Sequence, residues 1–215
     1  MPTVEVFDIT CRQCPRLAEY LATIKQQYPS YHAQPVAPFG ADQIQLLIVG
    51  LAPGLHGANA SGRPFTGDYA GLLLYQTLYK YGFSNAPVSN ALNDGLELSR
   101  CRITNAVKCV PPQNKPLPSE IAHCNHYLSA ELHALPERAV ILALGQIAHQ
   151  SVLKGFAIKQ KQAVFKHNSQ HELPGGRILV DSYHTSRYNM QTGRLTEAMF
   201  QQVFDHITAL LAEKS

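Results

Sequence analysis

The chain has 215 residues and a formal net charge of +3; 45% of its residues are hydrophobic and 15% are charged. This length suits one domain, so we expect a single domain over residues 1–215, and the low charged fraction excludes disorder driven by charge. The longest aliphatic run, Ala139–Leu144, is far shorter than the roughly 20 residues of a membrane helix, so we expect no membrane partner.

Residues 1–40 precede the first predicted strand, and we expect them to form an N-terminal lobe with one helix over Pro15–Tyr28. The lobe contains Cys11-Arg12-Gln13-Cys14, a CxxC pattern whose two thiolates chelate one metal centre. A thioredoxin-like CxxC follows a strand, so the place of this CxxC before the first predicted strand favours metal binding.

Met1–Asp8 carries no basic segment followed by an apolar core, so we expect no signal peptide and a cytoplasmic, reducing location.

Short apolar runs predict strands buried on both faces, and the stretches between them show helical spacing. The predicted strands are Gln45–Val49, Arg102–Val107, Ala139–Leu144 and Arg177–Asp181. The predicted helices are Tyr69–Tyr81, Ser119–Leu135, Gln146–Leu153 and Leu195–Leu211. Alternation of strand and helix indicates an α/β fold, a three-layer α/β/α sandwich around a mostly parallel four-stranded sheet.

The first of these strands runs into a long loop rich in glycine and proline, Gly50–Asp68. Ligand sites form beyond the carboxyl ends of parallel strands, and glycine lets backbone N–H groups approach a ligand closely. The loop lacks the GxGxxG and Walker patterns, which argues against a nucleotide cofactor. Its polar groups are His56, Asn59, Arg63 and Asp68, with Phe65 as a stacking face. The alternative is a loop that merely turns the chain.

Two later strands also end in polar side chains. Asn105 lies inside an apolar strand, where its amide can read a base edge with adjacent donor and acceptor groups, as uracil has, or can bond a nearby loop backbone. His184 follows the last strand, a position that favours ligand contact. We expect structural or solvated roles for the helical histidines His123, His126, His133 and His149.

The remaining cysteines and basic residues complete the candidate groups. Cys109 and Cys124 form the second natural pair, with a spacing too wide for a zinc knuckle, while Cys101 is left as a buried, inert thiol. Spacing alone does not separate zinc from an iron–sulfur cluster. Residues 154–176 form a basic loop or irregular ribbon, which is either a solvated connection or a phosphate contact.

Three stretches in this order resemble uracil-DNA glycosylases that carry an iron–sulfur cluster: Gly50–Gly54 through Gly67–Asp68, Ile103–Cys109, and Tyr183–Ser186 ahead of Thr192–Arg194. The resemblance spans roughly residues 11–200 and is strongest to family 5, also called type b. His56–Asp68 matches its HGxNxxGRxFTGD stretch. The related family 4 has a carboxylate early in its first motif, GEAPG, where this chain has Leu51.

The resemblance implies a function and a set of residues. Cys11, Cys14, Cys109 and Cys124 would hold a 4Fe-4S cluster that ties the N-terminal lobe to the sheet. Substrate-binding residues would be Gly54, Phe65, Asn105 and His184, with the Phe65 ring stacking on the base and His184 near O2 of the leaving base. Asp68 would assist water attack or stabilise the cationic sugar. Thr185 stands where the family usually has proline.

We therefore expect a monomeric hydrolase that excises uracil, and other deaminated bases, from DNA after base flipping. Catalysis would rest on Asp68, ionised at its ordinary pKa, and on a neutral His184. DNA phosphates would contact Arg63, Arg187, Arg194 and the Lys159–Lys166 loop. The alternatives are a family 4 enzyme with a narrower substrate range, a metal-stapled binding module without catalysis, and a purely structural Asp68 that caps the following helix.

Overall fold

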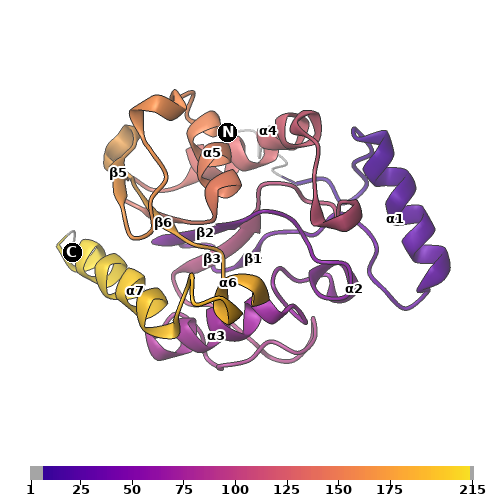
Figure 1. The fold of residues 1–215 in the computed structure, drawn as a ribbon, viewed down its shortest axis with the longest axis horizontal. Coiled ribbons are helices and arrows are strands. Elements are labelled where there is room, and N and C mark those ends of the chain that lie inside the picture. The colour runs from indigo at the N-terminus through magenta and orange to yellow at the C-terminus, as the bar shows by residue number, and fades with distance from the viewer. Residues whose placement is uncertain (1–6, 214–215) are drawn as a thin grey trace.

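The computed structural model describes residues 7–213 (Figure 1). The strands are β1 (Phe39–Gly40), β2 (Leu46–Gly50), β3 (Cys101–Asn105), β4 (Val140–Leu144), β5 (Gln170–Glu172) and β6 (Ile178–Ser182). The α-helices are α1 (Pro15–Gln27), α2 (Ala58–Ser61), α3 (Tyr69–Lys80), α4 (Pro118–Ala134), α5 (Gln146–Gly155), α6 (Arg187–Gln191) and α7 (Glu197–Ala212). Short 3₁₀ turns lie at Pro112–Asn114, Gln160–Gln162 and Pro174–Gly176. None of the described helices is long and apolar enough to cross a membrane.

The strands form one mixed sheet in the order β1-β3-β2-β4-β6-β5. The four inner strands are parallel and correspond to the four predicted from sequence, whereas β1 and β5 pair antiparallel at the two edges. The sheet thus has six strands rather than four. The edge strands escaped prediction because they span only two and three residues that are exposed or half-buried, so no apolar run marks them.

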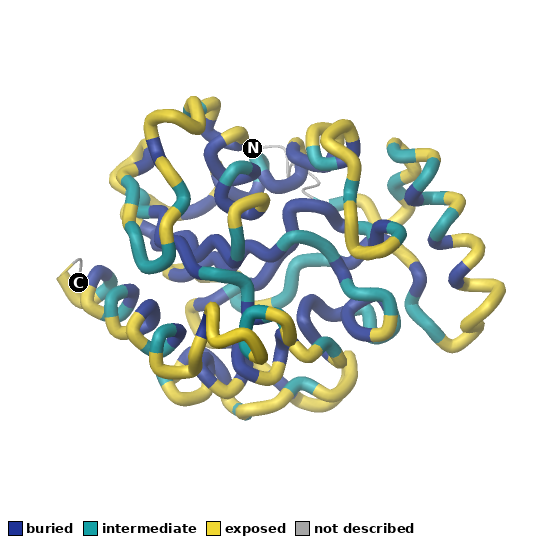
Figure 2. Tube along the Cα trace, in the orientation of Figure 1, coloured by how far each residue is buried: buried dark blue, intermediate teal, exposed yellow. Residues whose placement is uncertain are grey.

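Side chains of the inner strands alternate between two helical layers, which confirms the three-layer sandwich. Leu46, Ile48 and Leu142 face one cluster with residues of α3 and α7. Leu47 and Ile141 face the other cluster with residues of α4 and α5. Figure 2 shows the sheet as the buried centre of the molecule. Both faces are covered, which explains why the strands read as continuous apolar runs.

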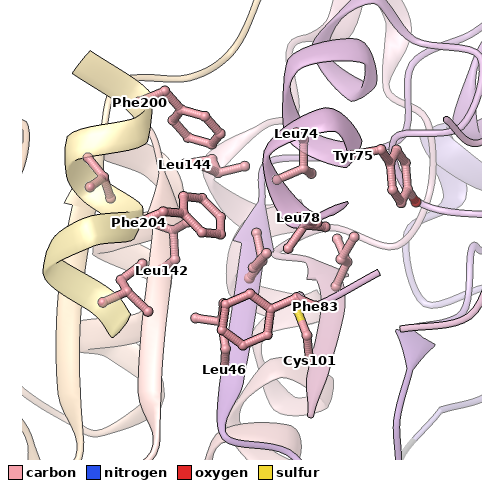
Figure 3. Packing of buried hydrophobic residues seen from close by; sticks show 14 of the residues in the cluster. Leu46, Leu74, Tyr75, Leu78, Phe83, Cys101, Leu142, Leu144, Phe200 and Phe204 are labelled. Atoms are coloured by element: carbon pink, nitrogen blue, oxygen red, sulfur yellow. The ribbon is translucent and has the colours of Figure 1, made fainter. Parts of the chain in front are cut away.

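The first of these layers has a core rich in aromatic residues. Phe200 and Phe204 of α7 pack with Leu74 and Leu78 of α3 over the sheet (Figure 3). Cys101 also lies in this core and is fully buried, and burial raises the pKa of its thiol far above the ordinary range. The expectation that Cys101 is buried is therefore confirmed, and its inertness stays a prediction.

The helix of the N-terminal region, α1, begins at Pro15 as predicted and lies at one end of the sheet (Figure 1). Leu17 packs near Val107 and Tyr127 in one small apolar cluster. A bidentate ion pair adds to this packing, because the Arg16 guanidinium donates to both carboxylate oxygens of Glu120 on α4 at 2.7 Å. Apolar packing and this ion pair join α1 to the rest of the molecule.

The segments after β2 and β6 are more ordered than the predicted loops. The Gly50–Asp68 loop contains the single helical turn α2, and the segment after β6 enters α6 at Arg187. Figure 1 shows α6 beside α3, although the two helices lie far apart in the sequence. Since β2, β3 and β6 are parallel, the segments that follow them lie on the same side of the sheet, at the carboxyl ends of the inner strands.

Candidate active site at the carboxyl ends of the strands

A cavity of about 290 Å³ lies where the segments after β2, β3 and β6 meet. It is lined by Leu51, Ala52, Gly54, Phe65, Asp68, Tyr69, Ala70, Asn105, Asn114, His184, Ser186 and Arg187. This set contains every residue that the sequence analysis assigned to catalysis or to the substrate. The tertiary structure therefore brings residues from distant parts of the sequence, from Gly54 to His184, together around one pocket.

Asn105 is the last residue of β3, paired in register with Gly50 of β2 and only 3% exposed. Its side-chain oxygen Oδ1 has no hydrogen-bond partner among the described residues. Only glycine fits at position 50 without displacing these side chains, because a Cβ there would lie 2.5 Å from Asn105 Oδ1 and 2.8 Å from the Phe65 ring. An unpartnered buried acceptor is costly, so its presence in a cavity indicates a ligand that donates a hydrogen bond.

Phe65 has a φ of +60°, a left-handed conformation that is uncommon for an aromatic residue. Its ring is nearly parallel to the His184 imidazole, at 29° with a centroid separation of 6.0 Å. The α3 backbone packs so closely behind it that a Cβ on Gly71 would lie 1.9 Å from the Phe65 carbonyl oxygen. The surrounding structure thus holds Phe65 in a strained conformation, a feature often found at functional sites.

Asp68 immediately precedes α3 and faces the backbone of the Gly50–Asp68 loop. Its Oδ2 accepts a hydrogen bond of 3.0 Å from the Ala58 N–H, and a Cβ on Gly57 would lie 2.1 Å from Oδ1. Its side chain makes no capping bond to α3, so the capping role considered as an alternative is wrong.

Burial also changes the titration of Asp68. It raises the pKa of this carboxyl above the ordinary value, although hydrogen bonds from the backbone of Ala58 and Gly54 favour the ionised form and oppose the shift. The expectation of an unperturbed pKa for Asp68 is therefore wrong.

His184 lies two residues beyond β6, and burial lowers the pKa of its imidazole to about 4, so the ring is neutral at pH 7. The segment that carries it is held at two points. The Asn189 side-chain amide donates to the His184 carbonyl at 2.8 Å, and the Thr185 hydroxyl donates to the Ala70 carbonyl at 2.9 Å. Thr185, the departure from the family pattern, is fully buried.

The three arginines expected to contact DNA differ in environment. Arg63 is 2% exposed, and its guanidinium is bound by Asp94 at 2.8 Å, by Ser89 at 2.9 Å and by the Leu92 carbonyl. The expectation of a DNA contact for Arg63 is therefore wrong, because its charge is used inside the protein. Arg187 and Arg194 are exposed, with their guanidinium groups over the rings of Tyr69 and Tyr183.

A second cavity, of about 440 Å³, borders the first, since both include His184. Arg194 and Lys166 line it, together with Phe165 and Tyr183. This concave surface therefore combines two cations with aromatic rings. Part of the basic 154–176 segment lies beside the site, as one of the two interpretations of that segment requires.

Several residues that line the first cavity are not marked by the sequence motifs. Tyr69 and Ala70 directly follow Asp68, so an extension of that motif into the first turn of α3 finds them. Asn114 lies in a proline-flanked 3₁₀ turn with a φ of +57°. No sequence pattern places that turn near residues 65–70, because only the fold brings the segment after β3 to this edge.

Four cysteines from three parts of the chain line another small cavity, of about 20 Å³: Cys11, Cys14, Cys109 and Cys124. Burial, together with the neighbouring thiols, raises the pKa of Cys109 to about 12 and that of Cys124 to about 11. Four cysteines around one cavity match the donor set of an iron–sulfur cluster, whose positive irons would offset repulsion between the thiolates.

A cluster of two histidines and an aspartate lies between α5, β5 and β6. Asp181 is fully buried, and its two oxygens contact His149 Nδ1 at 2.8 Å and His171 Nε2 at 3.1 Å. The other ring nitrogen of His149 lies 3.0 Å from the Ala163 carbonyl. Burial alone would lower the pKa of His149, but Asp181 raises it above the ordinary value. This cluster joins the 163–171 segment to β6, which agrees with the structural role expected for His149.

The sequence is similar to those of known DNA repair enzymes. The model of the uracil DNA glycosylase superfamily matches residues 37–208. The chain is 44% identical to a type-5 uracil-DNA glycosylase of Thermus thermophilus over 90% of each protein. It is 40% identical to one of Pyrobaculum aerophilum over 94% of this chain and 89% of the relative. A type-4 uracil-DNA glycosylase of Archaeoglobus fulgidus is 31% identical over 70% of this chain and 62% of the relative.

Proposed function

This chain belongs to the uracil DNA glycosylase superfamily, and from that membership we propose that it removes uracil from DNA by hydrolysing the N-glycosidic bond. The observation that carries the proposal is the unpartnered amide oxygen of Asn105 in a cavity shared with Phe65, Asp68 and His184. Residues of a single chain line this cavity, so we propose that a monomer suffices.

Base recognition rests on Asn105 and Phe65. Asn105 Oδ1 accepts the N3–H of uracil and Nδ2 donates to O4, a pairing that cytosine cannot match because it has an acceptor at N3 and a donor at C4. The Phe65 ring provides a stacking surface. A base inside a duplex cannot reach this cavity, so the nucleotide flips out, at a cost of a few kcal/mol that is smallest for a mismatch such as U·G.

Bond cleavage separates charge between the sugar and the base. The electrons of the C1′–N1 bond go to uracil, and neutral His184 donates a hydrogen bond to its O2 to stabilise the leaving anion. Ionised Asp68 stabilises the cationic sugar and orients the water whose oxygen bonds to C1′. The proton that this water loses passes to solvent, and the uracil anion takes up one proton from solvent, so the products are uracil and an abasic sugar. The Asp68 carboxylate therefore acts on the sugar, and the His184 imidazole acts on the leaving base.

The exposed cations Arg187, Arg194 and Lys166 are the proposed contacts to DNA phosphates, since they border the two adjoining cavities. Cys11, Cys14, Cys109 and Cys124 would hold a 4Fe-4S cluster. When bound, such a cluster supplies cross-linking of α1, α4 and the segment after β3. Catalysis rests on the residues of the first cavity.

The test is a uracil-containing oligonucleotide incubated with the protein and then treated with alkali, which cleaves at an abasic product. Asp68→Asn keeps the size of the side chain and an acceptor for the Ala58 N–H but removes the charge. We expect single-turnover excision to fall by about 10²–10⁴-fold, while binding to uracil-containing DNA persists. Excision within a few-fold of the parent would show that the carboxylate is structural.

The same assay separates the alternatives. A binding module without catalysis leaves the strand intact after alkali at every enzyme concentration. Leu51 lines the cavity at the position where the type-4 pattern has a carboxylate. We propose that the apolar wall widens the substrate range, so an oligonucleotide containing hypoxanthine should also be cut. A type-4 specificity predicts cleavage of the uracil strand alone.

A further inference from the structure

The segment that carries His184 and the helix that follows Asp68 are joined by one buried hydrogen bond. Thr185 is fully buried, and its hydroxyl donates to the carbonyl oxygen of Ala70 at 2.9 Å. Ala70 lies in the first turn of α3, two residues after Asp68. The partners are 115 residues apart in the sequence, so the bond connects two parts of the site that the backbone does not.

We propose that Thr185 is a positioning residue that fixes the His184 imidazole relative to Asp68 and the bound base. The inference rests on the proposed function, because it assigns Thr185 a task in that reaction. Thr185 does not touch the substrate. It acts through the neighbouring His184, because its hydrogen bond joins the backbone segment that carries His184 to the first turn of α3.

Two neighbouring contacts of this segment fix its position relative to α3 less directly. The bond from Asn189 to the His184 carbonyl lies within the segment itself, so it shapes the segment without fixing its position relative to α3. Arg187 lies over the Tyr69 ring at 5.0 Å, but both side chains are exposed and the contact has little directionality. Within residues 7–213 we find no second hydrogen bond between residues 182–192 and residues 65–80.

Charge stabilisation in the transition state depends on this placement. A donor lowers the barrier only if it lies within hydrogen-bond distance of the atom where charge develops, and a displacement of about 1 Å can cost on the order of 10²-fold in rate. His184 and Asp68 act on opposite ends of the breaking bond, so their separation must be held while the bond lengthens. The Thr185 bond provides a direct restraint on that separation.

The test compares Thr185→Val with Thr185→Ser. Valine keeps the shape of threonine and removes the hydroxyl, whereas serine keeps the donor. We expect T185V to lower the single-turnover excision rate by about 10-fold to 100-fold with little change in the Kd for uracil-containing DNA. T185S should stay within about 3-fold of the parent, because the donor is restored.

Thr77→Val is the matched control. Thr77 is also on α3 and is 2% exposed, and its hydroxyl donates to the Leu73 carbonyl at 2.7 Å within the same helix. T77V therefore removes a buried hydroxyl bond of the same kind without loosening the two sides of the site. We expect its Tm to fall in the same way as that of T185V while its excision rate stays at the parent level.

A double-mutant cycle with His184→Ala identifies the route of the effect. If Thr185 acts through His184, then T185V causes no further loss in the H184A background. The proposal is overturned if T185V excises at the parent rate while H184A is slow, or if T185V and H184A are additive. H184A at the parent rate would instead contradict the proposed function. Should T185V fail to fold, Thr185→Ala against T185S provides the same comparison.

Discussion

At the scale of single residues, burial shifts the pKa values of the two proposed catalytic groups in opposite directions: it lowers that of His184 and raises that of Asp68. His184 becomes harder to protonate, because the imidazolium loses its hydration, while Asp68 becomes easier to protonate for the same reason. The backbone donors of Ala58 and Gly54 limit the effect on Asp68. Around neutral pH this favours the combination that the chemistry needs, a neutral donor beside a carboxylate.

The pH dependence of excision follows from these shifts. A histidine with an ordinary pKa of about 6.5 would lose its neutral form below that pH, but His184 keeps it until the pH approaches about 4. We therefore expect single-turnover rates that are constant from about pH 8 to pH 6, with the acid decline at lower pH. Rates measured in buffers of constant ionic strength check this, and an inflection near pH 6.5 that H184A abolishes would contradict it.

Stability should respond in the interval between those two pKa values. The unfolded chain protonates His184 near pH 6.5, whereas the folded chain does so only near pH 4. Between them the unfolded state binds more protons, so the contribution of His184 to the free energy of unfolding declines as the pH falls through this interval. In H184A this part of the decline should be absent from urea unfolding curves.

At the scale of elements, the buried guanidinium of Arg63 connects two long loops. It joins the loop after β2 to the segment after α3 through Asp94, Ser89 and Leu92, and it lies 4.4 Å from the centroid of the Phe39 ring. Burial favours the neutral acid, but the Arg63 guanidinium and three backbone N–H groups hold the pKa of Asp94 well below its usual range. Asp94 therefore stays ionised at every physiological pH.

Replacing Arg63 should affect stability rather than DNA binding. Arg63→Met removes the guanidinium from Asp94 and from the Leu92 carbonyl, but Asp94 keeps its three backbone N–H donors, so we expect the free energy of unfolding to drop by about 1–3 kcal/mol in urea titrations. The dependence of DNA affinity on salt should stay unchanged, because Arg63 is not available to phosphates. The paired variant Arg187→Ala should do the reverse: an unchanged Tm and a salt slope reduced by about one.

A steeper loss of DNA affinity in R63M than in R187A, measured at temperatures where both are folded, would restore Arg63 as a DNA contact. A drop in the Tm of R187A would indicate instead that its contact with the Tyr69 ring stabilises α6 against α3.

At the scale of the whole molecule, the proposed cluster would join α1 to the segment after β3 and to α4, which packs on the sheet. Cys11 and Cys14 lie at the start of α1, Cys109 follows β3, and Cys124 is on α4. Since α1 lies outside the sheet layers, its attachment depends on small apolar clusters, the Arg16–Glu120 ion pair and any bound metal. A metal bound by these cysteines would add directly to the stability of this attachment.

Cys109→Ser should lower the iron-to-protein ratio and the thermal stability together, because a hydroxyl is a poor ligand for iron. Cys101→Ala is the control, since Cys101 lies in the apolar core away from the four-cysteine cavity. It should keep the iron and lose only packing. Iron analysis and thermal unfolding of freshly purified protein decide the matter. Iron retained in C109S and absent from C101A would reverse the ligand assignment.

Much of the fold could be predicted because its signals are local. Continuous apolar runs mark β2, β3, β4 and β6, and prolines mark the starts of α1 and α4. Since parallel strands carry their sites at the carboxyl ends, the same runs point to Asn105 and His184. Resemblance of motifs added the roles of Phe65 and Asp68. The single-domain organisation and the oligomeric state stay predictions.

The contacts that decide how the site works join residues far apart in the sequence. Sequence alone determined the layers, the inner strands and the identity of the polar groups, because hydrophobic periodicity and strand ends are properties of neighbouring residues. The tertiary structure decided that Arg63 is buried, that Asp68 bonds the loop rather than its helix, and that Thr185 fastens His184 to α3. Burial and distant pairing depend on how all the layers pack together, and no short segment contains that information.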